Sequence, residues 1–208
     1  MQRKPLHILA LGDSLTAGYH NYGASHHPYA THLTKLFEST NTPVEINEQG
    51  VDGERVVPAM AKRLGRLLEK DAFYDWVIIL GGTNDLGNGI SAEKIFKEGL
   101  KPMYKMCLDH KQSKIKLVAM TVIENTFNSP TCERDQNRQA LNTMIRDYVA
   151  KTNDHNRVFL VDLDKGIPYH SVNDIQERRQ IWNDALHLTP AGYDRMATLI
   201  FDEIKDKL

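Results

Sequence analysis

The sequence predicts an α/β fold in which a parallel β-sheet is covered by helices on both faces. Short aliphatic runs alternate five times with longer segments whose apolar residues recur every three or four positions. Aliphatic residues in succession, rather than in alternation with polar ones, are typical of parallel strands buried on both faces. Right-handed crossover helices join such strands, so we expect residues 1–208 to form a single doubly wound domain.

Five segments carry the strand pattern. In chain order, the expected strands are Leu6–Leu11, Val44–Asn47, Trp76–Leu80, Lys116–Val122 and Val158–Leu163. Four segments carry the helical pattern, and the residues expected to face the core are Val57, Met60, Leu64 and Leu67 in the first; Phe96, Leu100, Met103 and Cys107 in the second; Leu141, Met144, Ile145, Tyr148 and Val149 in the third; and Tyr193, Met196, Ile200 and Ile204 in the last.

Two prolines add detail to the helices. The second helical pattern runs from about Ala92 to Leu108, and Pro102 should kink or divide it because proline has no backbone N–H to donate. The last helix should begin at Thr189-Pro190, since threonine caps helix N-termini and proline is tolerated in the first turn.

The composition excludes several classes of protein. Hydrophobic residues make up 41% of the chain and charged residues 25%, and the net charge of −1 gives no indication of a nucleic-acid partner. No apolar run is long enough to span a membrane, and Leu6–Leu11 is too short for a secretory signal, so we expect a cytoplasmic location. Cys107 and Cys132 lack metal-ligand spacing and are expected to be reduced thiols. The sequence does not indicate an oligomeric state.

Polar clusters follow the predicted strands at the point where each strand ends. Ser14 follows the first strand, residues 50–53 follow the second, residues 81–87 follow the third, and residues 182–193 come after the fifth. Carboxyl ends of parallel strands meet at one edge of a sheet, where ligands of such folds bind. The clusters are therefore expected to lie together in space.

Three of these residues can form a catalytic triad. A serine hydroxyl becomes a nucleophile when a base removes its proton, and a third group must orient that base. Asp184 and His187 are three residues apart before the last helix, a spacing that can bring the carboxylate to one imidazole nitrogen. The sequence predicts the triad Ser14, Asp184 and His187.

A catalytic triad also needs donors for the developing oxyanion. The side-chain amide of Asn84 and the backbone N–H groups of Gly53 and Ser14 are the candidates. Each residue also has a purely structural explanation, because Ser14 can cap a helix, and Asn84 and Gly53 can form turns.

Together these segments make the sequence similar to the GDSL family of esterases and lipases, in its SGNH hydrolase form. The resembling blocks are "GDSLTAGY" with Ser14 as nucleophile, "GVDGERV" with Gly53 as oxyanion donor, "GGTND" with Asn84 as a further donor, and "DALHLTPAGY" with Asp184 and His187. The resemblance implies a flavodoxin-like three-layer α/β/α sandwich with a central parallel five-stranded sheet, and it implies that the enzyme needs no metal or organic cofactor.

The second block departs from the family pattern. The family commonly has Ser-Gly-Asp there, whereas this chain has Asp52-Gly53-Glu54. Gly50 is close enough in sequence to be the alternative oxyanion donor.

The sequence gives less information about the substrate. The loops 124–133 and 164–180 are too short for a large lid over a lipid surface, so we expect hydrolysis of small, short-acyl esters. Tyr169 and Trp182 are expected to shape the pocket. The alternatives are a carbohydrate deacetylase, a thioesterase or an acyltransferase that uses the same triad, or a non-enzymatic binding protein on the same fold.

Overall fold

The computed structural model describes residues 4–69, 73–111, 114–152 and 154–208. Its centre is a five-stranded sheet in the order β4-β1-β5-β6-β7, and every neighbouring pair of strands is parallel. The strands are β1 (Leu6–Gly12), β4 (Val44–Gly50), β5 (Trp76–Leu80), β6 (Lys116–Met120) and β7 (Val158–Val161). The predicted α/β fold with five parallel strands is confirmed.

Four strand ends differ from the prediction, and the smallest difference is in β1, which ends at Gly12 instead of Leu11. β4 continues to Gly50 instead of ending at Asn47, because its backbone stays paired with β1 as far as Gly12 although its side chains turn polar. β6 and β7 end earlier than predicted, at Met120 and Val161. Just beyond β6, the N–H of Val122 donates to the side chain of Asn142 at 2.8 Å instead of to a neighbouring strand.

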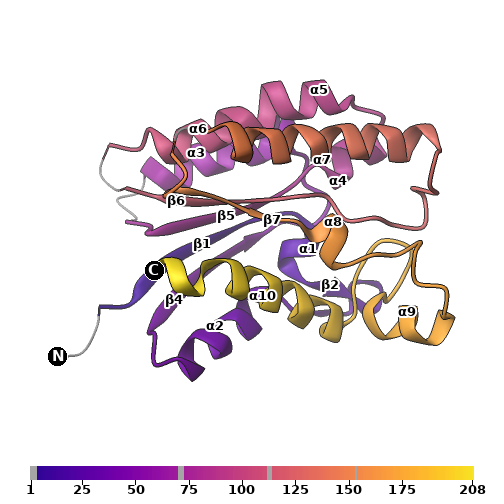
Figure 1. Ribbon diagram of the computed structural model, residues 1–208, viewed down its shortest axis with the longest axis horizontal. Coiled ribbons are helices and arrows are strands. Elements are labelled where there is room, and N and C mark those ends of the chain that lie inside the picture. The colour runs from indigo at the N-terminus through magenta and orange to yellow at the C-terminus, as the bar shows by residue number, and fades with distance from the viewer. Residues whose placement is uncertain (1–3, 70–72, 112–113, 153) are drawn as a thin grey trace.

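Helices cover both faces of the sheet (Figure 1). One face carries α2 (Tyr29–Ser39), α8 (Leu163–Gly166), α9 (Ile175–Ile181) and α10 (Pro190–Ile204). The other carries α3 (Ala61–Glu69), α4 (Thr83–Gly87), α5 (Ala92–Ile95), α6 (Lys101–Leu108) and α7 (Glu133–Lys151). A separate hydrophobic cluster fills the space between the sheet and each layer. The molecule is thus the expected three-layer sandwich.

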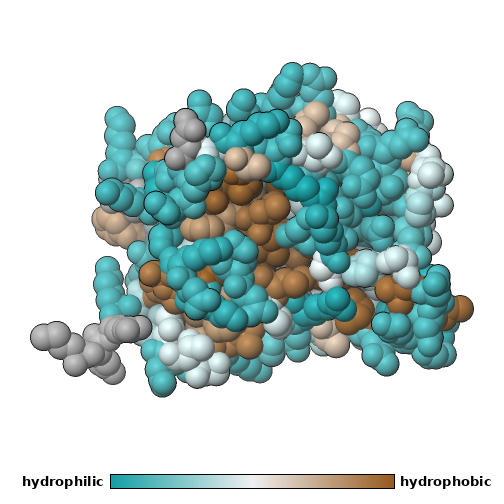
Figure 2. Space-filling model, viewed as in Figure 1, coloured by the Kyte–Doolittle hydropathy of each residue, from teal (hydrophilic) through white to brown (hydrophobic). Residues whose placement is uncertain are grey.

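Shorter elements complete the chain. They are α1 (Ser14–Ala17), an antiparallel pair of two-residue strands β2 (Tyr19–His20) and β3 (Ser25–His26), the 3₁₀ turns η1 (Asn21–Gly23) and η4 (Lys205–Lys207), and the π-type segments η2 (Val56–Met60) and η3 (Phe96–Leu100). Figure 2 shows hydrophilic residues over the outer helices and hydrophobic ones between the two helical layers, where the edge strand β7 lies in Figure 1.

The first helical pattern turns a different face to the core from the predicted one. Val56 and Leu68 are buried together with Met60 and Leu64, whereas Val57 and Leu67 are only partly buried. Val57 has an extended backbone inside η2, with φ at −106° and ψ at 118°, so it does not continue the helical repeat of α3.

The second and last helical predictions agree with the structure, whereas in the third Leu141 and Ile145 are buried and Met144, Tyr148 and Val149 are only partly buried. The segment 92–108 is divided into α5, the π-type turn η3 and α6, with Pro102 in the first turn of α6. Its predicted core residues are all buried. Thr189 caps α10, since its hydroxyl accepts the N–H of Gly192 at 3.2 Å.

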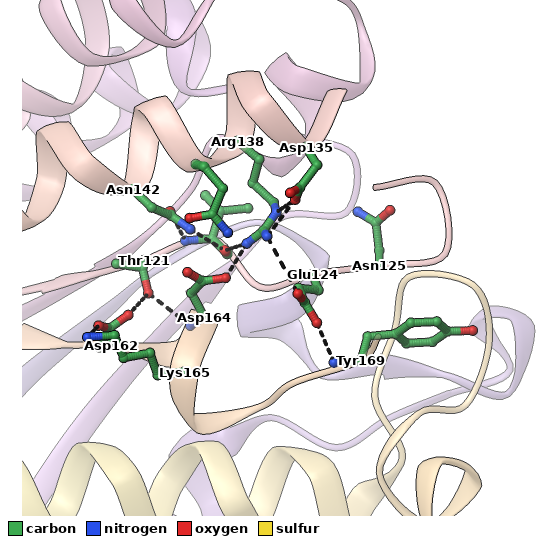
Figure 3. A network of polar contacts seen from close by, with 12 residues as sticks. Thr121, Glu124, Asn125, Asp135, Arg138, Asn142, Asp162, Asp164, Lys165 and Tyr169 are labelled. Atoms are coloured by element: carbon green, nitrogen blue, oxygen red, sulfur yellow. Dashed lines mark hydrogen bonds and ion pairs between the residues drawn. The ribbon is translucent and has the colours of Figure 1, made fainter. Parts of the chain in front are cut away.

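A buried arginine connects α7 to the sheet (Figure 3). Arg138 is 0% exposed, donates to the carbonyl of Val122 at 3.0 Å, and pairs with the carboxylates of Asp135 and Asp164. Arg146 also binds Asp164, at 2.7 Å, and binds Asp162. This network fixes the loops after β6 and β7, which border the carboxyl edge of the sheet.

We predict that Arg138→Met destabilises the fold strongly. Removing one partner from a buried ion-pair network leaves uncompensated carboxylates and costs about 3–5 kcal/mol of unfolding free energy. Urea denaturation measures this loss, with the exposed Arg66→Met as the matched control, which should change stability by less than about 0.5 kcal/mol. Equal stability of the two variants would contradict the assigned role of Arg138.

Candidate active site

The site begins where β1 ends. Gly12 pairs with Gly50 of β4 and with Leu80 of β5, so three strand ends lie side by side. Helix α1 starts at Ser14, only two residues later, and folds back tightly on the strand. A Cβ at position 12 would lie 2.1 Å from Oγ1 of Thr16 and 2.6 Å from the carbonyl of Leu80. Glycine is therefore needed for the sharp turn that leads to Ser14.

Ser14, His187 and Asp184 form one chain of hydrogen bonds. The Ser14 Oγ lies 3.1 Å from Nε2 of His187, and Nδ1 of the same ring lies 3.0 Å from Oδ2 of Asp184. In the neutral tautomer whose Nδ1–H donates to Asp184, Nε2 carries a lone pair and accepts the serine proton. The structure thus brings together the three residues predicted from positions far apart in the sequence.

Asp184 is held in its ionised form. Burial alone would raise the pKa of Asp184, but the backbone N–H groups of His187 and Leu186, both at 2.7 Å, and the His187 ring lower that pKa below its ordinary value. A charged carboxylate at this place fixes the imidazole and stabilises its protonated form.

Tyr19 is a site residue that the sequence analysis did not identify. Its ring packs on His187 with centroids 4.3 Å apart, and its carbonyl accepts the hydroxyl of Tyr193 at 2.7 Å. The ring of Tyr19 therefore restricts rotation of the His187 imidazole. Helix α10 holds Tyr19 in place through the hydroxyl of Tyr193. The only sequence signal was its position in the block that follows Ser14.

Asn84 projects between the loops that follow β1 and β4. Its Nδ2 donates to the carbonyl of Glu54 at 2.9 Å and to Oδ2 of Asp13 at 3.3 Å. The amide thus lies next to the residue that precedes Ser14, with its N–H groups held by fixed partners. This is the neighbourhood expected for an oxyanion donor.

Gly50 and Gly53 differ in what surrounds them. The N–H of Gly50 already donates to Oε1 of Glu48, at 2.5 Å. Gly53 lies in the turn after β4 with φ at +73°, a conformation that favours glycine, and nothing would touch a Cβ there within 4 Å. Gly53 is therefore open to a ligand, whereas the N–H of Gly50 is engaged.

The acidic neighbours of Gly53 are both engaged. Glu54 forms a bidentate pair with Arg63, whose Nε lies 3.0 and 3.1 Å from its two oxygens. Arg63 also donates to the carbonyls of Gly12 at 3.0 Å and Gln49 at 2.9 Å, at the ends of β1 and β4. Asp52 pairs with the exposed His26 at 3.1 Å. No sequence motif marked Arg63, which joins the loops of the site.

Asp13 is a buried acid directly before Ser14. It is 0% exposed, and its Oδ1 accepts the N–H of Leu15 at 3.0 Å as the cap of α1. The pKa of Asp13 is raised to about 7, chiefly by burial; the hydrogen bond from the N–H of Leu15 lowers this pKa, and the nearby charges of Asp85 and Glu54 raise it. Its proton is thus exchanged near neutral pH.

A pocket of about 300 Å³ adjoins Asn84. Its walls include Asn84, Leu186 and the loop after β6. Tyr169 and Trp182, which were expected to shape the pocket, are not among the residues that line it. Trp182 is 4% exposed and belongs to the core, and the hydroxyl of Tyr169 lies 2.9 Å from that of Thr126.

Two further findings concern the described residues. Within the ranges that the structure describes, no helix is long and apolar enough to cross a membrane. No group of three or more His, Cys, Asp or Glu residues in those ranges is arranged to hold a metal ion.

A serine, an imidazole and a carboxylate in hydrogen-bonded series at the carboxyl edge of an α/β sheet define the serine hydrolase class. The family model of the GDSL-like lipase/acylhydrolase family matches residues 10–195. The chain belongs to this family and is an ester-hydrolysing enzyme of the SGNH type. The alternative of a non-enzymatic binding protein is thereby discarded. Comparison with curated proteins finds no match.

Solved structures share the fold at low sequence identity. The lipase/acylhydrolase from Enterococcus faecalis is 24% identical with a TM-score of 0.73, and the match covers 98% of this chain and 97% of that one. A family 3 carbohydrate esterase from Clostridium thermocellum is 20% identical with a TM-score of 0.72, covering 98% and 96%. An acetyl xylan esterase from Geobacillus stearothermophilus is 18% identical with a TM-score of 0.67, covering 98% and 97%.

We predict that the difference in unfolding free energy between Asp13→Asn and the wild type favours the variant more at pH 8 than at pH 5. With a folded pKa of about 7 against an ordinary value of 3.8, Asp13 contributes stability that is complete below pH 3.8 and is lost as pH rises through 7. Asparagine keeps the acceptor for Leu15 and does not ionise.

Urea denaturation at the two pH values measures the effect, and one pKa unit corresponds to about 1.4 kcal/mol. The exposed Asp206→Asn serves as control and should show the same difference from wild type at both pH values. An Asp13→Asn effect that is independent of pH would refute the assignment.

Proposed function

We propose that this protein hydrolyses small, short-acyl carboxylic esters through a Ser14–His187–Asp184 triad and an acyl-enzyme intermediate. The observation that carries the proposal is the continuous series of hydrogen bonds from Ser14 Oγ through both ring nitrogens of His187 to Asp184. Ser14, His187 and Asp184 each have the hydrogen-bond partner that a catalytic triad requires. A helix cap or a turn alone would not require both hydrogen bonds of this series.

The reaction proceeds in two halves. Ser14 Oγ attacks the ester carbonyl while Nε2 of His187 takes the hydroxyl proton, and Asp184 stabilises the resulting imidazolium. When the tetrahedral intermediate collapses, the bond to the alcohol oxygen breaks and His187 gives its proton to the departing alkoxide. Water then attacks the acyl-enzyme in the same way, and the acid is released.

Three donors from three loops stabilise the oxyanion in this proposal. They are the N–H groups of Ser14 and Gly53 and the side-chain amide of Asn84. The contact of Asn84 with Asp13 is the longer of its two, at 3.3 Å, and is therefore the one that an oxyanion can most readily share. The hydrogen bond from Gly50 to Glu48 supports Gly53 over Gly50 as the backbone donor of the second loop.

The size of the site supports a small substrate. The pocket beside Asn84 measures about 300 Å³, at the lower end of the range for ligand sites. Deacetylation of a carbohydrate, thioester hydrolysis and acyl transfer to an alcohol use the same groups. Product analysis with a competing alcohol and with thioester analogues separates these alternatives from hydrolysis of simple esters.

We predict that Ser14→Ala and His187→Ala each lower kcat/KM for p-nitrophenyl acetate by about a thousandfold or more, because each removes a member of one concerted unit. Rates on p-nitrophenyl esters from acetate to palmitate should fall steeply beyond short chains. The exposed Ser39→Ala is the matched control and should retain full activity. Substantial activity in a folded Ser14→Ala enzyme would overturn the mechanism.

A further inference from the structure

We propose that the pocket beside Asn84 recognises a carboxylate carried by the ester substrate, and that Arg134 pairs with that carboxylate. The proposal rests on the proposed ester hydrolysis at Ser14 and names the substrate class of that same site. Its basis is the juxtaposition of an arginine and two asparagine amides, all without protein partners among the described residues, in one pocket that adjoins Asn84.

The pocket adjoins the candidate active site on the side of Asn84. Asn84 forms part of its wall, and so does Leu186, the residue directly before His187. A group bound here therefore belongs to the molecule whose ester bond lies at Ser14, on either the acyl or the alcohol side of that bond.

Two asparagine side chains in the wall lack partners for their amide groups. Asn128 is 5% exposed, and its side chain makes no hydrogen bond with any described residue. Asn125 is 8% exposed; its Oδ1 accepts the N–H of Phe127 at 2.9 Å, while its Nδ2 has no partner among the described residues. Figure 3 shows Asn125 standing apart from the Arg138 network. The amide atoms of Asn125 and Asn128 are not fully buried, so they are accessible from the pocket and available to donate to a ligand there.

Arg134 supplies the positive charge. It lies exposed in the first turn of the 19-residue helix α7 and makes no ion pair or hydrogen bond with the described residues. Its guanidinium lines the pocket, and the N-terminal end of the helix adds a positive partial charge. A planar guanidinium binds a carboxylate through two parallel hydrogen bonds.

The guanidinium of Arg134 has no carboxylate partner in the pocket wall. Among the described residues that line the pocket there is no aspartate or glutamate. The carboxylates behind the wall are engaged elsewhere: Asp135 and Asp164 pair with Arg138, and Glu124 accepts the N–H groups of Tyr169 at 2.6 Å and His170 at 2.9 Å. A ligand that only accepts hydrogen bonds and is negatively charged fits these groups better than a neutral alcohol.

Phe127 completes the recognition surface. It is 57% exposed and lines the same pocket. Its ring gives apolar contact to the carbon chain that would join the ester to the carboxylate. The site therefore fits an ester with a short hydrocarbon spacer between its carbonyl or alcohol oxygen and an ionised carboxyl group.

The test compares esters that differ only in this charge. Monoethyl adipate carries a carboxylate on the acyl side, and ethyl 6-methylheptanoate is its neutral isostere. The acetate ester of 4-hydroxybutanoate carries the carboxylate on the alcohol side, and 4-methylpentyl acetate is its neutral isostere. Acid release in a pH-stat gives kcat/KM for each, and the pair that shows the preference identifies the side.

We expect the wild type to prefer the carboxylate ester of one pair by about tenfold or more, since charge-assisted hydrogen bonds are stronger than those between neutral groups. Arg134→Gln should remove that preference by lowering kcat/KM for the carboxylate ester. Arg134→Glu should reverse the preference. Arg66→Gln, an exposed arginine in the last turn of α3, should behave as wild type. Equal rates on both members of both pairs overturn the proposal while ester hydrolysis stands.

A binding measurement separates failure of this inference from failure of the proposed function. Calorimetric titration of the Ser14→Ala protein with each of the four esters detects recognition without turnover. Carboxylate-dependent binding that is lost in Ser14→Ala/Arg134→Gln supports the pocket even where the wild type hydrolyses none of the esters. Equal binding of charged and neutral esters, or binding that is unchanged by Arg134→Gln, overturns it.

Discussion

The parallel pairing of β1 with β4 and β5 is the constraint on which the site depends. It places Gly12, Gly50 and Leu80 in one row, so the segments that follow them begin at a common edge. Ser14, Gly53 and Asn84 are thereby brought together from positions far apart in the chain. His187 and Asp184 come from the turn before α10, whose N-terminus is fixed by the Thr189 cap.

A second requirement is that the polar groups at this edge have partners. Arg63 binds Glu54 and the carbonyls of Gly12 and Gln49, and the carbonyl of Glu54 in turn accepts from Asn84. The loops that carry the proposed oxyanion donors are therefore positioned by one charged network. Arg138 has the corresponding role for the loops after β6 and β7. Because buried charges are costly unless paired, these contacts restrict the loops to one arrangement.

The sequence predicted the elements and candidate residues that are marked by a pattern of neighbouring residues in the chain. Aliphatic runs identified all five strands. The residues after the strands predicted Ser14, Asp184 and His187 as a triad, and the structure places these three in one series of hydrogen bonds. It did not predict the extension of β4 to Gly50, since that depends on backbone pairing and not on hydrophobicity. It also did not predict Arg63, Tyr19 or the burial of Asp13, because their contacts are made by segments distant in the chain.

The most direct test of the central claim is covalent trapping of the serine. The intact protein is treated with an alkyl fluorophosphonate, and the adduct is located by mass spectrometry of peptides. We expect one adduct, on Ser14. Its rate of formation should fall about a hundredfold or more in His187→Ala because the base is absent. An adduct on another residue, or equal labelling of wild type and His187→Ala, would contradict it.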